Sequence, residues 1–126
     1  MGADESTGAN PRAEVGRVGE DAALAAYERL GFRVVGRNWR CRAGELDLVV
    51  ERDQLLVFCE VKTRSGTAFG GGYEAVTWGK QRKLRQLAEL FVAAYRPTHA
   101  GIRFDVASVA LDRRGPPLVQ LFMDAF

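Results

Sequence analysis

The sequence predicts an α/β protein in which a mixed central β-sheet is flanked by helices, in the order helix, three strands, helix, strand. Apolar residues recur at helical spacing in residues 14–30 and 77–95. Between these segments, residues 46–51 and 55–64 are apolar runs of strand length joined by a two-residue turn, as in an antiparallel hairpin. A further strand, residues 102–111, follows the second helix, which predicts a parallel crossover beside the hairpin.

Length and composition predict one domain, because 126 residues with 47% hydrophobic content are enough for a single core. We expect a disordered tail over residues 1–12 and the domain over residues 13–126. The first ten residues are polar and lack the hydrophobic region of a signal peptide. No apolar stretch approaches the ~20 residues of a membrane span. The two cysteines form no disulfide framework, so we expect a cytoplasmic protein with reduced thiols and no membrane partner.

Residues 14–30 are predicted to form the first helix, which ends at Gly31. Its apolar arc contains Val15, Ala22, Ala23, Leu24, Ala26, Tyr27 and Leu30. Glu20 also lies inside this arc, and an acidic residue on the core-facing side of a helix needs a partner. That partner is either Lys62 or an arginine at the edge of the core, or a metal ion shared with other acids. We favour the metal slightly.

The next elements are three strands, residues 32–38, 46–51 and 55–64. The start of the third strand is apolar at odd and even positions alike, which is typical of a strand buried on both faces. Residues 65–76 are predicted to be a loop with four glycines. One interpretation of this loop is a flap or a close approach of backbone to substrate, and the other is a plain flexible connection.

A second helix is predicted to start after a capping Thr77 and to reach Tyr95. Its core stripe contains Leu84, Leu87, Ala88, Phe91 and Tyr95. The fourth strand, residues 102–111, follows it. Residues 118–123 are predicted to form a short edge strand.

The register of the hairpin brings two acids together. With a two-residue turn, Arg52 faces Leu55 and Asp47 faces Glu60, whereas a three-residue loop would offset these pairs. Directly opposed residues have Cβ atoms about 4.5–5.5 Å apart, which suits two carboxylates that share one divalent cation. Lys62 lies on the face of Glu60, because strand side chains alternate. Buried charges are costly without a partner or a metal, so this cluster indicates a site.

The chemistry of these side chains favours a hard cation. Mg²⁺ takes oxygen ligands and keeps several waters. Asp47, Glu60 and the carbonyl of Val61 would supply a partial shell, with Lys62 near the water that would attack. With two cysteines and His99 as the only histidine, zinc sites and His-based catalysis are poorly supported.

Basic residues form two clusters in a chain whose net charge is only +2. The first contains Arg33, Arg37, Arg40 and Arg42, and the second contains Lys80, Arg82, Lys83 and Arg85. Such clusters suit phosphate backbones. A solvated helix face and an arginine-rich loop are the alternative interpretation.

Taken in order, seven segments resemble the YraN family of small bacterial proteins, within the PD-(D/E)XK nuclease superfamily with its restriction-endonuclease-like fold. They are Gly16-Arg17-Val18-Gly19-Glu20-Asp21, Arg37-Asn38-Trp39-Arg40-Cys41-Arg42, Gly44-Glu45-Leu46-Asp47-Leu48, Glu60-Val61-Lys62-Thr63-Arg64, Ala68-Phe69-Gly70-Gly71, Lys80-Gln81 and Arg103-Phe104-Asp105-Val106. The resemblance spans roughly residues 14–110, and one departure is that Leu46, not the proline of the superfamily motif, precedes Asp47.

The resemblance implies a role for each site residue. Asp47 and Glu60 would bind Mg²⁺ or Mn²⁺, and Glu20 would join them from the first helix. Lys62 would orient or deprotonate the attacking water, and Gln81 would position Lys62 or the scissile phosphate. The nucleic-acid contacts that we expect come from Arg40, Arg42, Arg64, Lys80, Arg82 and Lys83.

The expected function is metal-dependent hydrolysis of DNA phosphodiester bonds by an endonuclease. Because no sequence-reading module is visible, we expect it to recognise branched, damaged or single-stranded structures rather than a base sequence. One alternative is a nucleic-acid-binding module without catalysis, and another is a buried ion network with a structural role. The superfamily's branch-cutting members often pair, so a homodimer stays open, although the sequence shows no self-complementary surface.

Overall fold

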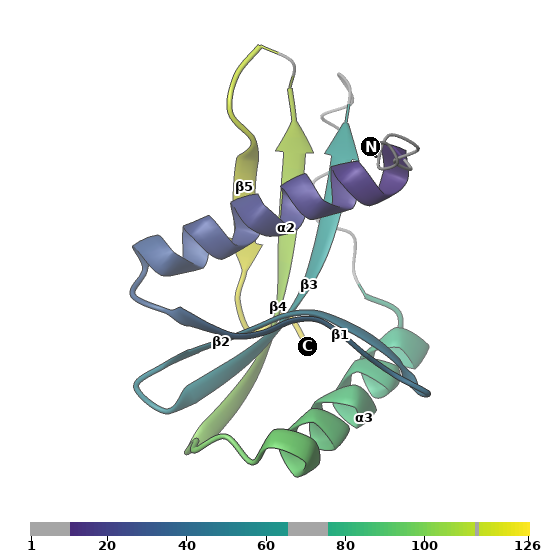
Figure 1. Ribbon diagram of the computed structural model, residues 1–126, viewed down its shortest axis with the longest axis vertical. Coiled ribbons are helices and arrows are strands. Elements are labelled where there is room, and N and C mark those ends of the chain that lie inside the picture. The colour runs from purple at the N-terminus through teal and green to yellow at the C-terminus, as the bar shows by residue number, and fades with distance from the viewer. Residues whose placement is uncertain (1–10, 66–75, 113) are drawn as a thin grey trace, which may run out of the picture.

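The computed structural model describes residues 11–65, 76–112 and 114–126, which form a five-stranded mixed sheet with helices packed on it (Figure 1). The strand order is β1-β2-β3-β4-β5, with β3 and β4 parallel and the other neighbours antiparallel. The elements in chain order are α2 Pro11–Arg29, β1 Arg33–Cys41, β2 Gly44–Arg52, β3 Leu55–Ser65, α3 Trp78–Tyr95, β4 Gly101–Leu111 and β5 Leu118–Phe122. The predicted fold class and element order are confirmed, including the edge strand.

Helix α2 crosses one face of the sheet, in front of β3, β4 and β5 (Figure 1). It begins at Pro11, before the predicted start of the domain, because the fixed φ of proline suits a first helical turn. The expected tail therefore loses its last two residues to the helix, and residues 1–10 lie outside the described residues. Gly19 lets α2 approach β3 closely, since a Cβ there would overlap the Thr63 hydroxyl.

The core has two layers, one on each face of the sheet. Beneath α2 it contains Ala23, Tyr27, Phe32, Leu48, Val50, Val57, Cys59, Ala107 and Val109. Beneath α3 it contains Leu46, Val49, Leu56, Phe58, Val76, Leu84, Leu87, Ala88, Phe91, Phe104 and Val106. The start of β3 supplies side chains to both layers, as its apolar pattern predicts.

Helix α3 covers the other face. Thr77 caps it as predicted, since its hydroxyl accepts a hydrogen bond from the Lys80 N–H at 3.2 Å. Four predicted stripe residues are buried, namely Leu84, Leu87, Ala88 and Phe91. The expectation for Tyr95 is wrong: it is 59% exposed, because its hydroxyl accepts a hydrogen bond from Trp39 Nε1 at 3.0 Å at the rim of the core.

Strand β1 continues to Cys41, beyond the predicted end at residue 38. Most of the glycine-rich loop predicted over residues 65–76 lies outside the described residues. In the ranges that are described, neither helix has the length and apolar character needed to cross a bilayer.

Candidate functional site

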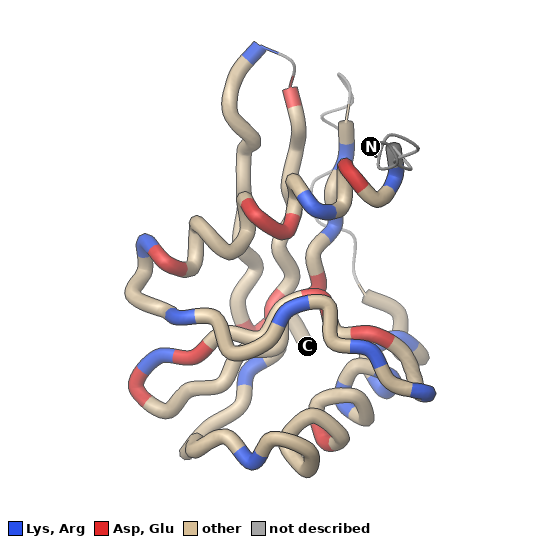
Figure 2. Tube along the Cα trace, in the orientation of Figure 1, with Lys and Arg blue, Asp and Glu red and all other residues tan. Residues whose placement is uncertain are grey.

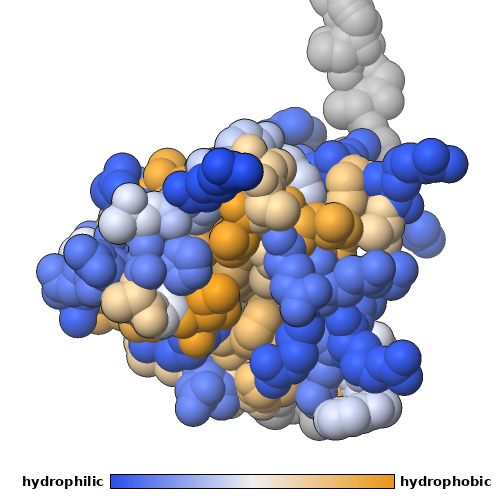
Figure 3. All heavy atoms as spheres, turned by 90° about the horizontal axis from the view of Figure 1, so that it is seen from below, coloured by the Kyte–Doolittle hydropathy of each residue, from blue (hydrophilic) through white to orange (hydrophobic). Residues whose placement is uncertain are grey.

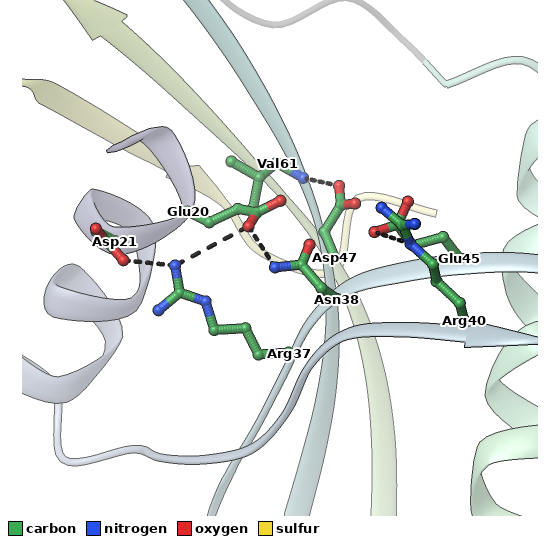
Figure 4. A network of polar contacts seen from close by, with 8 residues as sticks. All are labelled: Glu20, Asp21, Arg37, Asn38, Arg40, Glu45, Asp47 and Val61. Carbon is green, nitrogen blue, oxygen red and sulfur yellow. Dashed lines mark hydrogen bonds and ion pairs between the residues drawn. The ribbon is translucent and has the colours of Figure 1, made fainter. Parts of the chain in front are cut away.

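The β2–β3 hairpin has the predicted register. Arg52 pairs with Leu55 across the two-residue turn, and the ladder runs on to Leu48 and Cys59. Continued by one step, this register sets Asp47 opposite Glu60. There the ladder gives way to a side-chain contact, in which the Asp47 Oδ2 atom accepts a hydrogen bond from the Val61 N–H at 2.9 Å (Figure 4).

Asp47 is surrounded by other acids. The pKa of Asp47 is raised to about 7, first by burial and then by the nearby carboxylates of Glu60, Glu20 and Glu45. The hydrogen bond from Val61 acts in the opposite direction, because it stabilises the ionised carboxylate. The Asp47 carboxyl therefore sits in negative potential that a bound cation would offset.

Glu60 lies on the α3 face of the sheet. Its side chain is 16% exposed, and its Oε2 atom lies 3.4 Å from Lys80 Nζ, which reaches it from the first turn of α3. Lys80, predicted to contact nucleic acid, is thus also the ion-pair partner of a predicted metal ligand. Lys62 follows Glu60 on the same face, is partly buried and makes no ion pair within the part of the chain that the structure describes.

Glu20 approaches the site from α2 and has two partners on β1. Its Oε1 atom accepts a hydrogen bond from Asn38 Nδ2 at 2.9 Å and lies 4.0 Å from Arg37 Nη2 (Figure 4). Arg37 also pairs with Asp21. Glu20 therefore has an arginine at the edge of the core, as one of the two interpretations expects, and is still close enough to raise the pKa of Asp47.

The donor set fits a hard cation only as a partial shell. Among residues 11–65, 76–112 and 114–126, no three histidine, cysteine, aspartate or glutamate side chains lie close enough to hold one metal ion. Asp47 and Glu60 remain an all-oxygen pair, and Mg²⁺ is commonly bound by one or two carboxylates with water completing its shell. Metal binding by Asp47, Glu60, Glu20 and the Val61 carbonyl therefore stays a prediction.

The other predicted site residues lie around this pair. Gln81 donates a hydrogen bond from Nε2 to the Val76 carbonyl at 2.9 Å, which ties the first turn of α3 to the chain before it. Its predicted catalytic role stays a prediction. Arg40 lies 3.5 Å from Glu45 Oε2, and Arg64 is partly buried at the end of β3.

The two basic clusters lie on neighbouring elements. The β1–β2 turn packs against α3 through Gly44 and Leu87, and Figure 2 shows basic residues at this turn and at the start of α3. Arg42, Arg82 and Lys83 are exposed there. These positions suit contacts to one phosphate backbone.

Arg85 differs from its neighbours in the second basic cluster. Its guanidinium lies over the rings of Phe104 and Phe126, at 4.8 and 5.7 Å from their centroids. The two rings line a cleft of about 660 Å³ between α3 and β4. Apolar surface is exposed on this lower side of the molecule, between groups of hydrophilic residues (Figure 3). Arg85 is therefore engaged in packing.

A second polar cluster lies in the core around Asp105, for which sequence reasoning predicted an arginine partner and missed the other donors. This carboxylate is fully buried and accepts hydrogen bonds from Tyr27 Oη at 2.7 Å, from Arg103 Nε and Nη2 at 2.9 Å each, and from the Asp124 N–H at 2.9 Å. Burial raises the pKa of Tyr27 and of the neighbouring Cys59 thiol. The only sequence signal was an acid inside an apolar strand, from which an arginine partner alone could be expected.

The fold defines an α/β protein with a restriction-endonuclease-like core, whose neighbouring strands β2 and β3 carry Asp47, Glu60 and Lys62. Residues 19–109 match the model of the uncharacterised protein family UPF0102, the YraN family, and the chain belongs to this family. A UPF0102 protein of Frankia casuarinae is 46% identical over 112 residues, which is 89% of this chain and 95% of the relative. One of Mycolicibacterium smegmatis is 47% identical over 113 residues, 87% of this chain and 91% of the relative. The predicted resemblance is confirmed.

Proposed function

We propose that this protein is a metal-dependent endonuclease that hydrolyses DNA phosphodiester bonds at branched, damaged or single-stranded structures. The observation that supports this most is the position of Asp47: partly buried, hydrogen-bonded to Val61 and surrounded by three further carboxylates that raise its pKa. A partly buried carboxyl with a strongly raised pKa costs folding free energy, and such groups cluster at functional sites.

In this proposal Asp47 and Glu60 hold one Mg²⁺ or Mn²⁺, assisted by Glu20 or the Val61 carbonyl. When bound, the cation supplies Lewis-acid polarisation of the scissile phosphate. Lys62 orients the attacking water and donates a hydrogen bond to the phosphate oxygens as negative charge develops on them. Gln81 stabilises the start of α3, from which Lys80 reaches Glu60.

The exposed basic side chains at the β1–β2 turn and on α3 would hold the nucleic-acid backbone. Contacts to phosphate fix position without reading base sequence, so the substrate is selected by its shape. Lys80 would share its charge between Glu60 and the phosphate, since its side chain is 48% exposed.

The test compares metal-dependent cleavage of branched and linear DNA by wild type, Asp47→Ala and Lys62→Ala. Both variants should lose cleavage by a factor of about 10² or more. Asp53→Ala, which removes an exposed acid from the far end of the same hairpin, is the matched control and should cleave as wild type does. Equal activity in Asp47→Ala and Asp53→Ala would contradict the proposal.

A non-catalytic nucleic-acid-binding module is the second candidate. It is favoured by the basic side chains that already face two of the acids: Lys80 lies beside Glu60, and Arg37 lies near Glu20. It predicts DNA binding without any Mn²⁺ binding that depends on Asp47. Titration calorimetry of wild type and Asp47→Ala with Mn²⁺ distinguishes the two functions.

A further inference from the structure

Strand β1 changes face within three residues. Arg37 contacts α2 through Asp21, whereas Trp39 stacks on Phe91 of α3 with ring centroids 5.4 Å apart. In a regular strand, residues i and i+2 share one face of the sheet. The strand therefore turns over at the residue between them, Asn38.

Strand β2 turns over at the matching position. Leu48 packs in the layer beneath α2, and Leu46 packs in the layer beneath α3. These two residues pair with Arg37 and Trp39 respectively. The whole two-stranded ribbon thus rotates at one point, where Asn38 on β1 stands beside Asp47 on β2 (Figure 4). In Figure 1, β1 and β2 run across the view while β4 and β5 run vertically.

The backbone of Asn38 is left-handed, with φ of 51°. Asparagine is among the few residues other than glycine that adopt this conformation readily. Among the described residues, the other positive-φ residues that are not glycine lie in a turn, at a helix end or after the last strand, namely Asp53, Gln54, Arg96 and Asp124. The pairing register of β1 with β2 is the same on both sides of Asn38, and the β-bulge of this strand lies earlier, between Val34 and Gly36. The left-handed residue therefore rotates the ribbon without inserting an extra residue.

Asn38 affects two site acids at once. Where the ribbon turns, the ladder between β2 and β3 ends. There the Asp47 carboxylate accepts a hydrogen bond from the Val61 N–H at 2.9 Å. The Asn38 side chain donates to Glu20 at 2.9 Å and so fixes α2 to the same point of the sheet. Backbone and side chain of Asn38 thus act on different members of the acidic cluster.

We propose that Asn38 is a positioning residue of the candidate site: its left-handed backbone turns Asp47 out of the strand ladder, and its amide holds Glu20 beside it. This inference rests on the proposed function, because Asp47 and Glu20 need to be positioned only if they bind a metal ion. Asn38 itself touches neither metal nor substrate, and acts through Asp47 and Glu20.

The experiment measures two quantities in three variants. Hydrogen exchange of the Val61 amide, followed by NMR, reports whether Asp47 keeps its contact, and calorimetry reports the Kd for Mn²⁺. Asn38→Ala should speed exchange at Val61 about tenfold relative to amides of the β3–β4 ladder and raise the Kd about tenfold. Asn38→Gly, which retains the backbone conformation, should restore Val61 protection while the Kd stays raised, because Glu20 has lost its donor.

Asp53→Ala is the matched control, since it places alanine at φ of 52° in the β2–β3 turn, at the far end of the hairpin. It should change neither quantity. Val61 exchange and Mn²⁺ affinity in Asn38→Ala that equal those of Asp53→Ala would overturn the proposal.

If wild type binds no Mn²⁺, the proposed function fails, and Val61 exchange alone decides whether Asn38 positions Asp47. If Asn38→Ala does not fold, Asn38→Gly decides: wild-type Mn²⁺ affinity there would overturn the role of the amide, and a raised Kd would support it.

Discussion

At the scale of single residues, the Asp47 carboxyl couples the site to pH. A carboxyl that ionises near pH 7 rather than near 4 is better tolerated in the fold when protonated. The stability that the protonated Asp47 carboxyl contributes is fully present below its pKa in the unfolded chain, about 3.9. That stability is lost as pH rises through its pKa in the folded protein, about 7. Proton loss is also the condition for binding a cation, so metal affinity should rise as stability falls.

We therefore expect Asp47→Asn to be more stable than wild type at pH 8, by on the order of 2 kcal/mol, and nearly equal to it below pH 4. The amide retains an acceptor for Val61 without adding charge to the acidic cluster. Urea unfolding of both proteins at several pH values measures this difference. A gap that does not grow between pH 4 and 8 would contradict the raised pKa of Asp47.

At the scale of residues, prediction from the sequence succeeded where hairpin register or side-chain alternation along a strand determines the position of a residue. The two-residue turn determined the partner of Arg52. Cys59 and Val61 of β3 pack on the α2 side, so alternation leaves Glu60 and Lys62 together on the other face. Prediction could not find Asn38, because a left-handed residue inside a strand leaves no periodic signal. The partners of Glu20 likewise depend on how α2 docks, which local pattern does not determine.

At the scale of elements, the docking of α2 on β3 depends on Gly19. A Cβ at this position would overlap the Thr63 hydroxyl, so a larger residue must push the helix away from the strand. Glu20 follows Gly19 in the chain, so its distance from Asp47 depends on the same contact.

Gly19→Ala should therefore lower the free energy of unfolding by about 1–3 kcal/mol. Gly16→Ala is a matched control in the same helix, because a Cβ there would meet nothing within 4 Å. It should leave stability unchanged or raise it by up to about 1 kcal/mol through helix propensity. Thermal unfolding of both variants makes the comparison, and a Gly19→Ala protein as stable as Gly16→Ala would mean that the helix shifts without cost.

The ends of elements were harder to predict than their existence. Strand β1 runs to Cys41 because it pairs with β2 as far as Gly44, and a pairing partner is not visible in the strand's own residues. Tyr95 fits the apolar stripe of α3 in sequence, yet its hydroxyl keeps it at the rim beside Trp39.

At the scale of the whole molecule, Asp105 connects parts that are distant in sequence. Tyr27 brings α2 to this carboxylate across 78 residues of chain, and the Asp124 N–H brings the segment after β5. Non-local contacts of this kind cannot be read from a single sequence, which is why only the arginine partner could be expected. The buried carboxylate depends on all its donors, because an unsatisfied buried polar group is costly.

Tyr27→Phe should lower the free energy of unfolding by about 1–3 kcal/mol, because it removes one donor from Asp105 without changing ring volume. Tyr95→Phe removes a hydroxyl at a site that is 59% exposed and should cost less than about 0.5 kcal/mol. Urea unfolding of the two variants gives both values. Equal effects would show that the core hydrogen bond is no stronger than the surface one.

The contrast between the two free cysteines has a practical consequence. Cys59 is 4% exposed, and burial raises the pKa of its thiol, whereas Cys41 is partly exposed at the end of β1 beside Arg42. Because the thiolate is the reactive species, a maleimide dye should attach to Cys41 and spare Cys59. The unaltered chain thus offers one attachment point for a fluorophore, at the β1–β2 turn where the bound nucleic-acid strand is proposed to run.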